Sequence, residues 1–101
     1  MAKVQPLTEA VYYILLSLQS PLHGYGIIKK VAEMTNGRVN LGAGTIYGAI
    51  NTLSSKGYIV ESSVNVAKKE YIITDLGLEV LKQEYARLNE LVANGKDILE
   101  G

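Results

Sequence analysis

The feature that most constrains the fold is a change of hydrophobic periodicity at Gly57. Before this glycine, apolar residues recur at the three- and four-residue spacing of amphipathic helices. After it come two short β-branched and aromatic runs, residues 58–62 and 70–74, with a largely polar stretch between them. A helical pattern then returns from Asp75 onward. This order predicts three helices, a β-hairpin and one long helix.

Two helices are expected before the central one, over residues 8–18 and 23–35. The first is apolar on nearly all sides, so we expect it to be buried on more than one side, in part by another subunit. Pro21 separates the two helices, and His23 and Gly24 open the second. The pair Asn36-Gly37 is a typical helix end.

The third helix, predicted over residues 43–56, has two contrasting faces. Ile46, Ala49, Ile50 and Leu53 share one face, which is suited to a core. The opposite face carries small, uncharged residues, namely Gly44, Gly48, Asn51 and Ser55, and Thr45 and Tyr47 flank it on either side. A helix with such a face can lie close against another surface. Gly57 is a natural residue to end it.

The last helix carries a heptad pattern. Thr74 is a candidate N-cap, and Asp75 follows where the helix dipole favours negative charge. The apolar seam consists of Leu78, Leu81, Tyr85, Leu88 and Val92. Charged residues, Glu79, Lys82, Glu84, Arg87 and Glu90, are assigned to the other faces, and Gly95 is expected to end or fray the helix. The seam can serve the chain's own core or a partner helix, and its length favours a partner.

Composition and charge limit the possible functions. The 101 residues fit one domain, with no Cys for a disulfide or a thiolate metal site and a single histidine, His23. No apolar run is long enough for a membrane helix and no signal-peptide pattern is seen, so a cytoplasmic location is expected. Residues 1–74 hold seven basic and four acidic side chains, and residues 75–101 hold three and six. The N-terminal part can therefore face a polyanion. We expect no enzyme activity, no metal and no cofactor.

The order of elements predicts a mainly α (α+β) fold, a winged helix-turn-helix with an added C-terminal dimerisation helix. Residues 1–74 form the DNA-binding domain, with a recognition helix at about 43–56 and a wing at about 58–74. Residues 75–101 form the dimerisation helix, packed on the same domain. In this arrangement Asn51 can bond adenine, and the wing lysines lie near phosphates. The predicted DNA contacts are Tyr25, Gly44, Thr45, Tyr47, Asn51, Ser55, Lys68 and Lys69.

Four stretches, spread in order over about residues 7–85, resemble the PadR family of transcriptional regulators. They read His23-Gly24-Tyr25, Gly44-Thr45-Ile46-Tyr47, Lys56-Gly57-Tyr58-Ile59 and Lys69-Glu70-Tyr71-Ile72-Ile73-Thr74. The resemblance implies a homodimeric bacterial repressor whose first and last helices form the dimer contacts. In some members a small aromatic or drug-like effector bound near those contacts releases the DNA.

Two sets of residues follow from this implied dimer. The predicted interface consists of Tyr12, Leu16, Leu78, Leu81, Tyr85, Leu88 and Val92. A candidate effector pocket consists of Tyr12, Tyr13 and Tyr85, for which plain dimer packing is the alternative.

The chain departs from the family pattern in its basic residues. Where the recognition helix often has Arg or Lys after the tyrosine, this chain has Gly48, Ala49 and Asn51. The wing lacks a Gly-Arg-Pro-Arg-type run, and there is no Trp to stack a drug-like ligand. The main hypothesis is a dimeric repressor of a pseudo-palindromic double-stranded DNA operator. The alternative is a winged-helix module whose small-residue face binds protein instead of DNA.

Overall fold

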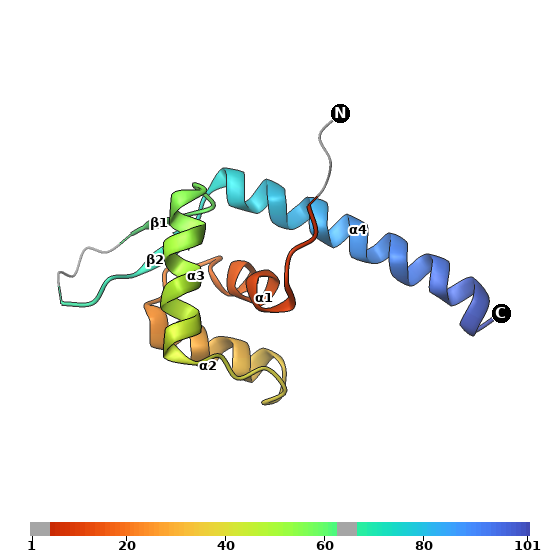
Figure 1. The fold of residues 1–101 in the computed structure, drawn as a ribbon, viewed down its shortest axis with the longest axis horizontal. Helices are drawn as coiled ribbons and strands as arrows, with labels where there is room; N and C mark the ends of the chain where they lie inside the picture. The colour runs from red at the N-terminus through yellow and green to blue at the C-terminus, as the bar shows by residue number, and fades with distance from the viewer. Residues whose placement is uncertain (1–4, 63–66) are drawn as a thin grey trace.

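The computed structural model describes residues 5–62 and 67–101 and shows a mainly helical chain with one small sheet (Figure 1). The elements, in order, are α1 (Glu9–Ser17), α2 (Gly24–Met34), α3 (Ala43–Ser55), β1 (Ile59–Glu61), β2 (Tyr71–Ile73) and α4 (Asp75–Leu99). This is the predicted order, and α3 ends one residue before its predicted limit. Residues 63–66 of the predicted wing, and residues 1–4 of the predicted domain, lie outside the described residues.

Side chains cap three of the helices. Thr8, His23 and Thr74 each accept a hydrogen bond from the backbone N–H three residues later, at 3.1, 3.2 and 3.0 Å. Each bond pairs one of the N–H groups that a helix start leaves without a partner. The third helix differs, because Gly42 at its N-cap position offers no side chain.

Gly57 ends α3 in the predicted way. Its φ of 78° is in the left-handed region that glycine adopts most readily. The chain therefore turns back, and the Tyr58 N–H donates to the Leu53 carbonyl at 3.0 Å. This is the hydrogen bond of a Schellman cap, and it sends the chain directly into β1.

Side chains from α1, α2, α3, β1 and the first half of α4 form one hydrophobic core between these elements. Its fully buried members are Ile14, Leu15, Leu18, Ile27, Val31, Ile46, Ile50, Leu53, Ile59 and Leu81. Among them are three of the four residues predicted to form the inner face of α3, and the fourth, Ala49, is partly buried against this core. The opposite face of α3 is therefore left to solvent.

The wing is held at both edges of β2. On one edge β2 pairs antiparallel with β1, with Ile59 opposite Ile73. On the other edge Tyr71 exchanges backbone hydrogen bonds with Leu22, at 2.9 and 3.1 Å, and the Ile73 N–H donates to the Leu18 carbonyl at 2.9 Å. The segment between α1 and α2 thus acts as a third, very short strand. It places the wing beside the start of α2.

The long helix α4 starts at the wing, passes over α1 and then extends beyond the rest of the chain (Figure 1). Its 25 residues span roughly 37 Å at 1.5 Å per residue. The expected end at Gly95 is wrong, since the helix continues to Leu99. A single glycine costs only about 1 kcal/mol in a helix interior, which the turns on either side offset.

Two side chains of α4 are buried within the single chain. Glu84, assigned to a solvent face, is 1% exposed. Leu81, assigned to a dimer interface, is 5% exposed within the single chain, because the first half of α4 covers this chain's own core. Periodicity shows that a face is apolar, but it does not show which neighbour covers that face.

Gly77 should be essential for the start of α4. A Cβ at this position would clash with the Tyr58 carbonyl oxygen and lie 2.9 Å from Ile73 Cγ1. We expect Gly77→Ala to destabilise the protein by about 1–3 kcal/mol, the usual cost of overpacking. Chemical unfolding followed by circular dichroism, at equal protein concentrations, measures the change.

Gly95→Ala is the matched control. A Cβ at Gly95 meets nothing within 4 Å. This second substitution should therefore be neutral, or should stabilise the helix by up to about 1 kcal/mol. Equal stability of the two variants would contradict the close approach of α4 to Tyr58.

Candidate nucleic-acid interface

The outer face of α3 is open to solvent. The predicted contacts Gly44, Thr45, Tyr47, Asn51 and Ser55 are all exposed, whereas Ile46, Ile50 and Leu53 on the inner face are at most 3% exposed. The hydroxyl and amide groups of the outer face are thus free of the core. They can donate to and accept from an external partner.

The two glycines of α3 have no packing role in the chain. A Cβ at Gly44 or at Gly48 would meet no atom within 4 Å. Each nevertheless costs the helix up to about 1 kcal/mol relative to alanine. A surface that approaches the backbone of α3 closely is a physical reason for such residues.

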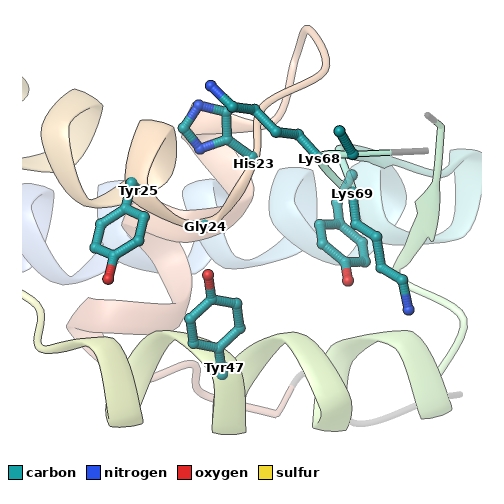
Figure 2. Close-up of a pocket in the computed structure, with 8 residues that line it drawn as sticks. His23, Gly24, Tyr25, Tyr47, Lys68 and Lys69 are labelled. Atoms are coloured by element: carbon teal, nitrogen blue, oxygen red, sulfur yellow. The ribbon is translucent and has the colours of Figure 1, made fainter. Parts of the chain in front are cut away.

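A hollow of about 450 Å³ lies where the start of α2, the middle of α3 and the wing meet (Figure 2). We call it the wing–helix hollow. It is lined chiefly by His23, Tyr25, Tyr47, Lys68, Lys69 and Tyr71. Four of these, Tyr25, Tyr47, Lys68 and Lys69, are among the predicted DNA contacts. The fold therefore brings together residues that are up to 44 positions apart in the sequence.

Tyr25 and Tyr47 face the hollow from opposite sides. In Figure 2 the Tyr47 side chain rises from α3, and the Tyr25 side chain extends toward it from α2. Tyr47 is 46% exposed and Tyr25 is 64% exposed. The end of the Tyr47 ring rests on Gly24, where a Cβ would lie 2.9 Å from the ring and its hydroxyl. Gly24 thus allows the hydroxyl end of Tyr47 to approach the start of α2 closely.

His23 has a local structural role. Its Nδ1 accepts the Gly26 N–H at 3.2 Å, so in the neutral ring the proton is on Nε2. Among the residues that the structure describes, no group of three or more His, Asp and Glu side chains is placed to hold a metal ion.

A second pocket, of about 340 Å³, lies between the N-terminal segment, α1 and α4. We call it the α1–α4 pocket. Its lining consists of Leu7, Glu9, Tyr12, Tyr13, Glu84 and Leu88. It includes two members of the candidate effector pocket, the edge-to-face pair Tyr12 and Tyr13, whose ring centroids are 6.1 Å apart. The third member, Tyr85, is 59% exposed and does not line it.

The phenol of Tyr12 remains protonated at neutral pH. Burial raises its pKa, and the neighbouring Tyr85 and Glu84 raise it further. The hydroxyl can therefore donate as well as accept a hydrogen bond in the α1–α4 pocket.

Glu84 is a buried carboxylate that sequence reasoning missed. It accepts two hydrogen bonds from Arg87, at 2.6 and 2.8 Å, and a third from the Leu7 N–H at 2.9 Å. The Arg87 hydrogen bonds hold the pKa of Glu84 below its ordinary value, and they outweigh the opposing effect of burial. The spacing of Glu84 and Arg87 is a sequence signal for an ion pair, but Leu7 is 77 positions away. Only the fold reveals that contact.

The predicted interface residues differ in exposure. Tyr12, Leu16, Leu78 and Leu88 are half-buried, Tyr85 and Val92 are exposed, and Leu81 belongs to the core. Beyond Leu88 the apolar side chains of α4 are uncovered, since Leu91, Val92, Ile98 and Leu99 are between 52% and 85% exposed. A helix that is apolar along one side and stands clear of its own domain has the form of an association surface.

An exposed polar helix face next to a wing that carries lysines is typical of winged-helix nucleic-acid-binding proteins. The sequence matches the model of the transcriptional regulator PadR-like family over residues 13–83. The chain belongs to this family, as the sequence motifs predicted, and has its winged-helix fold. It is therefore a DNA-binding transcription regulator. The comparison with curated proteins gives no match.

Solved structures share this fold. A PadR family transcriptional regulator from Eggerthella lenta is 28% identical, with a TM-score of 0.75 over 89% of this chain and 80% of that one. A PadR family regulator from Clostridium difficile is 23% identical, with a TM-score of 0.72 over 93% and 100%. BpsR of Bordetella bronchiseptica, whose DNA binding is regulated by 6-hydroxynicotinic acid, shares the fold at 17% identity, with a TM-score of 0.69 over 89% and 61%.

The described residues contain no helix long and apolar enough to cross a membrane.

The buried Glu84 should make stability depend on acid pH. Its folded-state pKa is lowered, so its contribution is fully present above the ordinary value of 4.5 and is lost as the pH falls toward the folded value. We expect Glu84→Gln to lower the free energy of unfolding by about 1–3 kcal/mol at pH 7. The difference from the unsubstituted protein should shrink below about pH 4.5. Urea unfolding at several pH values measures it, and a difference that is constant down to pH 3 would contradict this role.

Proposed function

We propose that this protein is a homodimeric transcriptional repressor that binds a pseudo-palindromic operator and is released by a small-molecule effector. In this proposal α3 lies in the major groove of each half-site, and the wing lies along the backbone. The α4 helices of two chains hold the half-sites in register. Enzymatic chemistry has no part in this proposal.

The observation that carries the proposal is the wing–helix hollow. Residues from α2, α3 and the wing, which were expected separately to contact DNA, line one concave surface with two lysines. Phenol hydroxyls and ammonium groups both bind phosphate oxygens. The open N-terminus of α3, without a capping side chain at Gly42, adds N–H donors that favour an anion.

Dimerisation through α4 is supported by its uncovered second half. Leu91, Val92, Ile98 and Leu99 would be buried between two copies of the helix, which gives apolar association energy without any change in the domain. A homodimer repeats the same reading surface by two-fold symmetry. The operator should therefore have two half-sites about one helical turn apart, roughly 10 bp.

Release by an effector is supported by the α1–α4 pocket. It lies where α1 meets α4, so a ligand there would contact both the DNA-binding domain and the proposed dimerisation helix. The edge-to-face pair Tyr12 and Tyr13 offers ring surfaces to an aromatic ligand. BpsR, a protein of the same fold, has its DNA binding regulated by a small molecule.

A mobility-shift assay on the DNA upstream of the protein's own gene, with a salt series, tests the proposal. Binding should weaken steeply as salt rises, because phosphate contacts release counterions. Sedimentation at the same concentrations should show a dimer on the DNA. The absence of salt-sensitive binding to any duplex would favour the alternative, a winged-helix module whose small-residue face binds protein. The zero net charge of the chain motivates that alternative.

Asn51→Ala and Lys69→Ala should affect DNA binding in different ways. Loss of the Asn51 amide should reduce discrimination at one base pair by about 1–3 kcal/mol, because the amide can bond adenine. Loss of the Lys69 charge should weaken binding to all sequences alike and lower the salt slope. Affinities for the operator and for single-base variants, measured at several salt concentrations, distinguish the two. Equal losses on every sequence for both variants would contradict these roles.

Gly48→Ala should make the protein more stable and a weaker DNA binder. The added methyl meets no atom of the chain and removes a glycine from a helix, so the free energy of unfolding should rise by up to about 1 kcal/mol. The same methyl stands on the surface proposed to lie in the groove, where it would hold the backbone away. Unfolding and operator affinity are measured on one preparation. Unchanged affinity would show that DNA does not approach Gly48.

A further inference from the structure

We propose that the wing–helix hollow is a second ligand site, which binds a small aromatic carboxylate in direct competition with the DNA backbone. This inference rests on the proposed DNA-binding role of the same residues. It goes beyond the effector proposed above, which would occupy the α1–α4 pocket.

The walls of the hollow suit an aromatic ring. Three tyrosines from three different elements line it, Tyr25 from α2, Tyr47 from α3 and Tyr71 from β2. Tyr47 is supported by its contact with Gly24, and Tyr71 is held at the backbone by the two hydrogen bonds to Leu22. A volume of about 450 Å³ lies within the usual range of small-molecule sites. One planar ring therefore has aromatic surface on several sides.

The charge of the hollow suits an anion. Lys68 and Lys69 line it, and Figure 2 shows the two side chains leaving the wing in different directions. No Asp or Glu is among the described residues that line it. The tyrosine hydroxyls add neutral donors, which also bond carboxylate oxygens. An aryl carboxylate combines the ring and the negative charge that these groups select.

The α1–α4 pocket has the opposite character. Its charged lining residues are the carboxylates Glu9 and Glu84, and no lysine or arginine lines it. Glu84 is already bound by Arg87, and Glu9 is paired with Arg38 at 2.7 Å. An anion placed there would face two carboxylates without a free cation among the lining residues. Between the two pockets, an aromatic acid should therefore choose the wing–helix hollow.

Occupation of the hollow and binding of DNA exclude one another. The hydroxyls and lysines that would hold the carboxylate are those proposed to hold a backbone phosphate. The ligand therefore needs no conformational change to release DNA. Direct competition has a measurable signature, since the apparent Kd for DNA rises in proportion to free ligand without a plateau. An effector at a separate site gives a plateau set by the coupling energy.

Benzoate is the probe for this site, with benzylamine and benzyl alcohol as the matched cation and neutral compound. Each is titrated into ¹⁵N-labelled full-length protein at constant ionic strength, balanced with sodium chloride. We expect benzoate to shift the amide signals of Gly24, Lys68 and Lys69 at lower concentration than the other two compounds. Signals of Leu7 and Tyr13, in the α1–α4 pocket, should not move. Shifts confined to the α1–α4 pocket, or equal shifts from all three compounds, would overturn the inference.

Substitutions on the wing test the role of charge. The double variant Lys68→Gln with Lys69→Gln should weaken benzoate binding at least tenfold. The matched control is Lys82→Gln, an exposed lysine of α4 that lines neither pocket, and it should leave benzoate binding unchanged. Surface glutamines do not disturb the core, and a preserved amide spectrum verifies the fold. Unchanged benzoate affinity in the double variant would contradict the site.

Competition is then measured on the unsubstituted protein with the operator. At a benzoate concentration ten times its own Kd, the apparent Kd for DNA should rise about elevenfold by mass action. A lower plateau, or a complex of protein, DNA and benzoate, would overturn direct competition. Salt-sensitive DNA binding with no benzoate effect would leave the proposed function intact and refute only this inference. Benzoate binding in the hollow without DNA binding to any duplex would refute the proposed function instead, and with it the competition.

Discussion

The hydrogen bonds of Thr74 join the end of α3, the base of the wing and the start of α4. Its hydroxyl donates to the Gly57 carbonyl at 2.6 Å, at the end of α3, and accepts the Gly77 N–H at 3.0 Å, at the start of α4. Its own N–H donates to the Tyr58 carbonyl at 3.0 Å, at the base of the wing. Gly77 lets α4 approach Tyr58 so closely that no side chain fits between them. The directions of α3, the wing and α4 are thus set at one junction.

The concave face of the wing and α3 carries few charges. The outer face of α3 offers hydroxyls, an amide and bare backbone, and positive charge comes from Lys68 and Lys69 on the wing. Arg38 is engaged by Glu9 in a bidentate pair, and the Lys56 ammonium lies 5.9 Å from the centre of the Tyr58 ring. In our proposal shape and hydrogen bonding therefore matter more than net charge, and dimerisation doubles the number of contacts. In the same proposal, this scarcity of charge is what lets a small anion compete with DNA for this face.

Most of the fold follows from periodicity and local chemistry. The two faces of α3, the glycine that ends it, the Thr74 cap and the two strands all depend on neighbours within a few residues, and these predictions hold. The errors concern α4, where the expected end at Gly95 and the placement of Glu84 away from the buried face are wrong. Leu81, a member of the predicted seam, is buried in this chain's own core. Leu81 and Glu84 depend on which surface covers each turn of the helix. That information is not in the helix itself.

The sequence by itself determined the order of elements, the exposed polar face of α3 and, through four short motifs, the family. These features are local, because helix and strand patterns, caps and turns are decided by residues close together in the chain. Only the tertiary structure decided that Tyr25, Tyr47, Lys68 and Lys69 share one hollow, and that Glu84 is buried on Arg87 and the Leu7 N–H. Both arrangements join residues from different elements. Their geometry depends on how β2 pairs with the α1–α2 connection and how α4 crosses the core, and no local pattern encodes either.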